Sequence, residues 1–134
     1  MNRNAELQSW QGEIQEFLNW YMGMLEHIQK TREHGYHVFI NDVPISIEAF
    51  KLRLKSLQNL STPKLKECKK IKKPLEESIK HQIKALQLET KYCQDIQDGT
   101  LAGRLGAGAT TFSAVMAGKL LKKSLSEFEA MRTE

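Results

Sequence analysis

The N-terminal segment alternates apolar and polar positions with the period of a helix. Its apolar side chains recur at steps of three and four residues, which places them along one side of an α-helix. They are Leu7, Trp10, Ile14, Phe17, Leu18, Tyr21, Met24, Leu25 and Ile28. Lys30 and Arg32 suit the negative end of a helix dipole, and Gly35 suits a helix terminus. The pattern predicts an amphipathic helix over about residues 4–34.

Residues 36–45 have a different character. They are rich in β-branched and aromatic side chains and include the turn formers Asn41, Asp42 and Pro44. This composition predicts an ordered, extended connection rather than a helix. Ser46 is expected to cap a second helix after it. The apolar positions of that helix are Ile47, Phe50, Leu54, Leu57 and Leu60.

The second half of the chain predicts two further helices. Thr62 can cap the first of them, which should run to the break at Asp98–Gly99 and be kinked or restarted at Pro74. The last helix is expected over residues 100–131. The sequence therefore predicts one domain spanning residues 1–134. Its fold should be an all-α, up-and-down bundle of about four helices, with an ordered extended connection after the first.

The composition agrees with a folded domain in a reducing compartment. Of the 134 residues, 40% are hydrophobic and 27% charged, which is too apolar for a disordered chain. Cys68 and Cys93 form no metal-binding spacing and fall on the apolar stripe of one predicted helix, so they are expected to be buried thiols. Residues 1–10 contain no apolar run of the secretory type. We expect a cytoplasmic protein, at most peripheral to a membrane.

Small residues crowd the first half of the last helix. Five of the eight glycines lie between Gly99 and Gly118, although each glycine inside a helix costs about 1 kcal/mol relative to alanine. Small residues allow another helix to approach closely. One explanation is a central helix of the bundle, gripped by large side chains such as Trp10 and Tyr21. The other is a surface that binds a partner helix, with these candidate residues: Gly103, Gly106, Ala114 and Gly118.

The same stretch raises the question of a membrane. Residues 101–121 contain only two charged side chains, those of Arg104 and Lys119. A permanent transmembrane helix is nevertheless disfavoured, because Arg104 is costly at that depth and the Gly, Ser and Thr residues dilute the apolar character. Insertion after the bundle opens remains an alternative.

Lysines dominate the middle of the chain. Residues 51–91 hold twelve Lys or Arg against four Asp or Glu, whereas residues 1–50 hold three against seven. On a helix, Lys66, Lys69, Lys70 and Lys73 share one side and can bind phosphates or anionic lipid headgroups. Alternatively, the row is a solvated face partly neutralised by the acidic first helix. Nucleic acid is disfavoured as the partner, because Arg53 is the only arginine of this region and lysines read bases poorly.

The sequence contains few residues in a pattern typical of a catalytic or metal site. His34 and His37 are three residues apart and His27 lies two turns earlier, but zinc needs three or four converging ligands. No Ser/His/Asp or Cys/His grouping follows from the periodicity, so neither an enzyme nor a cofactor is expected. The sequence favours a helical interaction module that binds a protein partner or itself, with a homodimer as the expected assembly. The alternative is peripheral membrane binding or insertion through the lysine row and the Gly/Ala-rich helix.

Overall fold

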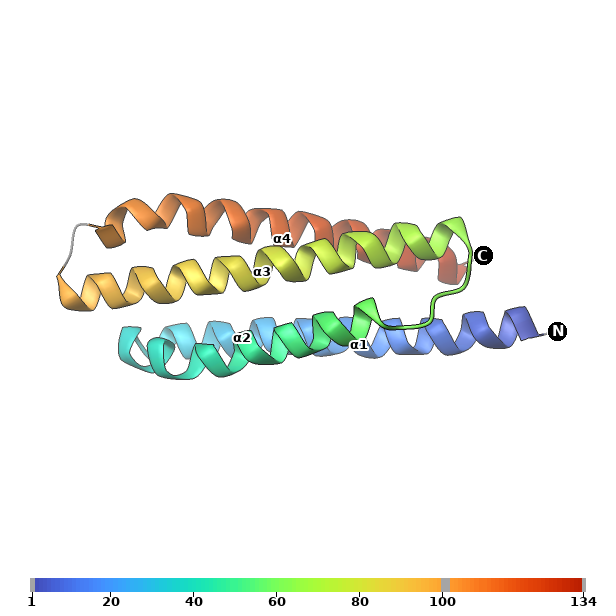
Figure 1. The fold of residues 1–134 in the computed structure, drawn as a ribbon, viewed down its shortest axis with the longest axis horizontal. Helices are drawn as coiled ribbons and strands as arrows, with labels where there is room; N and C mark the ends of the chain where they lie inside the picture. Colours follow the sequence, from blue (N-terminus) through green and yellow to red (C-terminus); the bar gives the residue numbers. More distant parts are fainter. Residues whose placement is uncertain (1, 100–101, 134) are drawn as a thin grey trace.

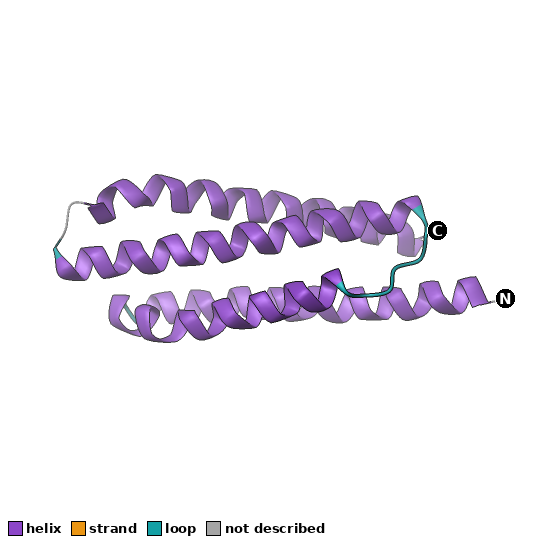
Figure 2. Ribbon diagram, viewed as in Figure 1, coloured by secondary structure: helices purple, strands orange, loops and turns teal. Residues whose placement is uncertain are grey.

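The chain folds into four long helices. The computed structural model describes the backbone of residues 2–99 and 102–133 and the side chains of residues 4–99 and 111–132. Within these ranges it contains no strand and the helices α1 (Asn2–Glu33), α2 (Tyr36–Gln58), α3 (Lys66–Asp98) and α4 (Ala102–Thr133). Successive helices run in opposite directions, and each packs against the next, α1 on α2, α2 on α3 and α3 on α4 (Figures 1 and 2). The predicted all-α, up-and-down bundle is confirmed.

The extended connection predicted over residues 36–45 is wrong, because α2 begins at Tyr36. Its buried residues Phe39, Val43, Ile47 and Phe50 recur at steps of three and four, so helical packing buries them on one side. This packing outweighs the weak helix propensity of β-branched residues. Pro44 is exposed, and water can bond the Ile40 carbonyl that loses its helical donor there.

Only His34 and Gly35 separate α1 from α2. Gly35 has φ 101°, a backbone conformation that side chains disfavour, which explains a glycine at this tight reversal. The predicted cap at Ser46 is also wrong, since Ser46 is buried inside α2. Helix α2 ends at Gln58, so Leu60, which was predicted among its apolar positions, lies just beyond the helix.

Helix α3 starts later than expected and does not restart at Pro74. Its N-cap is Leu65, whereas the Thr62 hydroxyl donates to the Leu60 carbonyl and accepts the indole N–H of Trp10 at 3.2 Å. Thr62 therefore ties the α2–α3 connection to α1 instead of capping α3. The helix runs without interruption through the buried Pro74 to Asp98, and Gly99 ends it in the left-handed conformation.

The core gathers apolar side chains from every helix. An aromatic cluster joins α1 to α2, where the Phe50 ring lies 5.1 Å from Trp20 and 5.4 Å from Tyr21, both edge-on. The largest side chains with less than 2% exposure are Tyr21, Phe39, Phe50, Phe128, Ile14, Leu18, Ile28, Ile71, Leu75, Ile79, Leu86 and Val43. Burial of this set is the main favourable term in folding.

Candidate interaction surface

Helix α4 packs on α3 along a seam of small side chains. The Ser78 hydroxyl donates to the Ala117 carbonyl at 2.6 Å, and the Ser124 hydroxyl donates to the Ile71 carbonyl at 2.8 Å. All of Ser78, Ala117 and Ser124 are 1% exposed or less. A serine reaches the backbone of a neighbouring helix only where the two helices approach closely. The small residues Ser113, Ala117 and Ser124 therefore set the α3–α4 distance.

The small residues singled out from the sequence lie off this seam. Ala114 and Gly118 are exposed, each one position after the seam residues Ser113 and Ala117. Apart from its two chain neighbours and the backbone of its own helix, no atom of the described residues lies within 4 Å of the point that a Cβ would occupy at Gly118, so no large side chain in the described part of α1 grips it. Gly103 and Gly106 lie outside the residues whose surroundings the structure describes.

The outward side of α4 carries two lines of exposed residues. The first, which we call the glycine stripe, consists of Ala114, Val115 and Gly118. The second, which we call the phenylalanine–lysine stripe, consists of Phe112, Lys119 and Lys123, spaced so that they share one side of the helix. Phe112 is 64% exposed and Val115 is 48% exposed. Exposed apolar side chains that adjoin one another on a helix are candidates for intermolecular contact, whereas single ones are common on protein surfaces.

The lysine row of α3 faces solvent. Lys66, Lys69, Lys70 and Lys73 are all exposed, and none of them has an ion pair or side-chain hydrogen bond among the described residues. The acidic residues of α1 do not neutralise the row through any ion pair in that part of the chain. Glu16 instead lies 3.6 Å from Arg53 of α2. The row remains an uncompensated cationic surface.

Lys72, which lies between members of the row, has a different role. Its ammonium group donates to the Leu60 carbonyl at 3.2 Å and to the Gln58 carbonyl at 3.5 Å. These carbonyls lie at the end of α2, where the last turn of a helix lacks backbone donors. Lys72 therefore stabilises the end of α2 and is not available to a partner.

The register of the seam brings the lysines of α4 to the lysine row. Because Ser124 lies opposite Ile71 and Ala117 opposite Ser78, Lys122 and Lys123 lie at the level of residues 72–73 of α3. Over residues 66–80 and 115–132, ten Lys or Arg accompany five Asp or Glu. Two of these carboxylates already pair with Lys80 and Arg132. This end of the α3–α4 hairpin is therefore strongly cationic.

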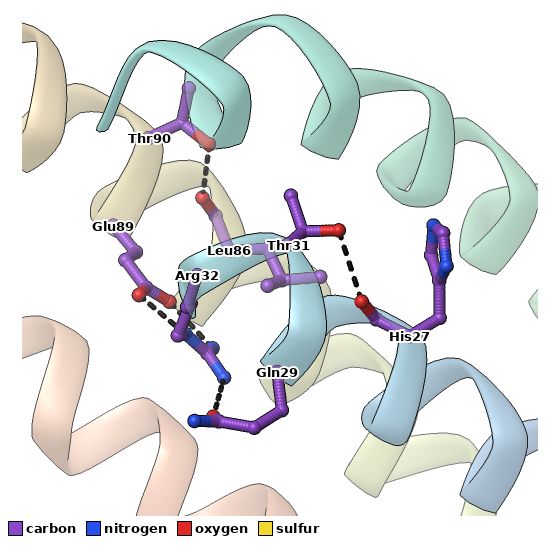
Figure 3. A network of polar contacts seen from close by, with 7 residues as sticks. All are labelled: His27, Gln29, Thr31, Arg32, Leu86, Glu89 and Thr90. Carbon is purple, nitrogen blue, oxygen red and sulfur yellow. Dashed lines mark hydrogen bonds and ion pairs between the residues drawn. The ribbon is translucent and has the colours of Figure 1, made fainter. Parts of the chain in front are cut away.

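A polar network joins α1 to α3 at the other end of the bundle (Figure 3). The Nε and Nη2 groups of Arg32 each donate to one oxygen of the Glu89 carboxylate at 2.7 Å, and Nη1 donates to the Gln29 side-chain carbonyl at 3.1 Å. The carboxylate raises the pKa of Arg32. The hydroxyl oxygens of Tyr21 and Ser78 lie 2.8 Å apart. These two residues are 57 positions apart in the sequence, as are Arg32 and Glu89. The two contacts fix a single register between the parallel helices α1 and α3.

The histidines do not assemble a metal site in the described part of the chain. His27, His34 and His37 are all exposed, and the nearest polar partner of the His37 ring is Asn41 at 3.3 Å. Among the described residues, no three side chains of His, Cys, Asp or Glu are grouped closely enough to hold a metal ion.

Both cysteines are buried free thiols, as expected. Cys68 is 0% and Cys93 is 4% exposed, and burial raises the pKa of each thiol. They lie 25 positions apart on one continuous helix, a span of about 37 Å, which is too long for a disulfide.

A groove of about 780 Å³ opens between the start of α1 and the α2–α3 connection. Glu6 and Glu13 lie on its α1 wall, and Pro63 and Lys64 lie on the opposite wall. The groove follows from the length of α1, whose first turns extend beyond the α2–α3 connection (Figure 1).

Two broader findings bear on function. Within the described residues, none of the helices has the length and hydropathy needed to cross a bilayer. No family model, curated protein or solved structure matches the chain.

Proposed function

We propose that this protein is a non-enzymatic helical interaction module that binds a second copy of itself through the glycine stripe of α4. The observation that carries the proposal is the open space around Gly118. A glycine inside an exposed helix costs about 1 kcal/mol relative to alanine. No neighbour among the residues that the structure describes requires its small size. Close approach of another helix would supply the reason that the monomer lacks.

The neighbours of Gly118 favour this stripe over other exposed glycines. Gly12 and Gly23 of α1 are equally open, but the exposed residues four positions away on either side are polar. They are Gln8 and Glu16 for Gly12, and Asn19 and His27 for Gly23. Gly118 instead adjoins Ala114 and the half-exposed Val115. A stripe of small and apolar residues can bury area at a helix crossing without leaving polar groups unpaired.

The charges around the stripe are compatible with a two-fold pair. In an antiparallel α4–α4 contact centred between Val115 and Gly118, Lys119 lies opposite Ala114 of the second copy, and Lys122 lies opposite Thr111. Like charges do not meet. A two-fold contact uses the same patch on both copies, so one stripe suffices to form a homodimer.

Sedimentation equilibrium over a wide concentration range tests the proposal. Val115→Glu should shift the protein to the monomer, because two carboxylates would be buried at the crossing within one helical turn of each other. Ile45→Glu is the matched control, since Ile45 of α2 is 73% exposed and lies outside the stripe. A wild-type protein that stays monomeric, or an equal response to both substitutions, would contradict self-association through α4.

A further inference from the structure

The lysine row lies outside the proposed α4 dimer, and the phenylalanine–lysine stripe borders the dimer contact at Lys119. They lie on neighbouring helices, α3 and α4, which run side by side in opposite directions (Figure 1). Lys66, Lys69, Lys70 and Lys73 come from α3, and Phe112, Lys119 and Lys123 come from α4. All seven side chains are exposed.

We propose that these seven residues form a docking surface for membranes that contain anionic phospholipid. The first argument is charge complementarity. Six ammonium groups without ion-pair partners among the described residues project from two rigid helices at one end of the hairpin. Basic clusters of this size are attracted to the negative surface potential of membranes rich in phosphatidylserine.

The second argument is the kind of side chain that accompanies the charge. Phe112 is 64% exposed on the same stripe as Lys119 and Lys123. An apolar ring flanked by lysines suits the boundary between headgroups and acyl chains, where the ring enters and the lysine stems extend toward the phosphates. The bundle need not open for this contact, because Phe112 already lies outside the core.

The residue types favour lipid over nucleic acid as the anionic partner. All six cations are lysines, which act as point charges, whereas reading of bases and bidentate phosphate binding rely on arginine. Phe112 is a single exposed ring rather than a series of stacking platforms. A soluble polyanion would use the lysines and leave Phe112 without a role.

The test is co-sedimentation with vesicles of phosphatidylcholine alone or mixed with phosphatidylserine, at low and at physiological salt. Wild-type protein should bind the mixed vesicles, lose affinity as salt rises, and ignore phosphatidylcholine. Each lysine lost should weaken binding about fivefold, the factor that corresponds to roughly 1 kcal/mol per lysine. Combined Lys69→Glu, Lys70→Glu and Lys73→Glu should therefore weaken it by at least about 100-fold.

A matched control changes net charge by the same amount elsewhere. Lys30, Lys51 and Lys55 are exposed on α1 and α2, outside the docking surface. Their combined change to Glu should leave most of the binding intact. Equal loss in the two triple variants would overturn the proposal, because net charge alone would then explain the attraction. Absence of binding to the mixed vesicles at low salt would overturn it as well.

Variants of Phe112 distinguish binding to a lipid surface from binding to a soluble polyanion. Phe112→Ser should weaken vesicle binding about tenfold and leave binding to double-stranded DNA or polyphosphate unchanged. Brominated acyl chains should quench the fluorescence of a tryptophan introduced by Phe112→Trp. They should not quench the fluorescence of one introduced by Leu52→Trp, at a site on α2 that is 68% exposed. DNA binding as tight as vesicle binding, with no effect of Phe112→Ser, would refute the proposal.

The lysine variants should leave the sedimentation equilibrium of the α4 dimer unchanged. Failure of membrane docking and failure of self-association are therefore distinguishable on the same samples.

Discussion

Adjacent positions on α4 offer a sharp test of which small residues hold the bundle together. Ala117 is 1% exposed at the α3–α4 seam, whereas the space around Gly118 is open. Changing each residue in turn to leucine places the same side chain first at the buried seam and then on the solvent-exposed surface of one helix. Ala117→Leu should destabilise the protein strongly, and Gly118→Leu should not.

The expected difference follows from the seam. A leucine at position 117 adds three carbons where helices are held by the 2.6 Å bond from Ser78 to the Ala117 carbonyl, and overpacking costs about 1–3 kcal/mol. Separation of the helices would also weaken that bond and the bond from Ser124 to the Ile71 carbonyl, at about 1 kcal/mol each. The total is about 3–5 kcal/mol. Gly118→Leu should instead stabilise the monomer by about 0.5–1 kcal/mol, through helix propensity.

Urea unfolding followed by far-ultraviolet circular dichroism measures both effects. The protein should be dilute enough to stay monomeric, so that loss of dimer does not contribute. The wild-type free energy of unfolding is expected to be about 5–15 kcal/mol, so the loss at Ala117 is large enough to resolve. If Gly118→Leu costs as much as Ala117→Leu, the assignment of the seam is wrong.

Three further predictions concern buried or paired polar groups. Burial raises the pKa of Tyr21 to about 12 from 10.0, so the unfolded state loses the phenol proton at lower pH than the folded state. The free energy of unfolding should therefore fall by about 2 kcal/mol between pH 10 and 12 relative to Tyr21→Phe, and an equal pH dependence of the two proteins would argue against it. Glu89→Gln should cost about 0.5–1 kcal/mol, because Arg32 is partly exposed, and this cost should shrink in high salt; a salt-independent cost would mean that the charge pair does not matter. Cys68 and Cys93 should react with a disulfide reagent much more slowly in native protein than in urea, since burial raises both thiol pKa values and shields the sulfurs, and fast native labelling would show that α3 opens.

Hydrophobic periodicity predicted most of the fold because the stripes of α1 and α3 are long and regular. The first turns of α2 were missed for a physical reason. Asn41, Asp42 and Pro44 are turn formers in isolation, but they occupy the solvent side of a helix whose opposite side buries Phe39 and Val43. Local propensity is weak, and tertiary packing decides such segments.

The lysine row was easier to place than the small residues. Residues at i, i+3, i+4 and i+7 share one side of a helix, and lysines rarely face a core, so the exposure of Lys66 and Lys73 followed from spacing alone. Small residues carry no such preference. Ser113 and Ala117 are four residues apart, and so are Ala114 and Gly118. The two pairs lie next to each other on the helix surface, and periodicity cannot say which pair packs against a neighbouring helix. Only the position of Ser78 on α3 distinguishes them.

The two hydroxyl bonds across the α3–α4 seam also have a mechanical consequence. Ser78 donates from α3 to α4, and Ser124 donates from α4 to α3 about two turns away. The pair opposes sliding in either direction, because a shift of one helix along the other would break both bonds together. The hairpin should therefore resist sliding of α4 along α3, so that the axial offset between Lys70 on α3 and Phe112 on α4 is preserved.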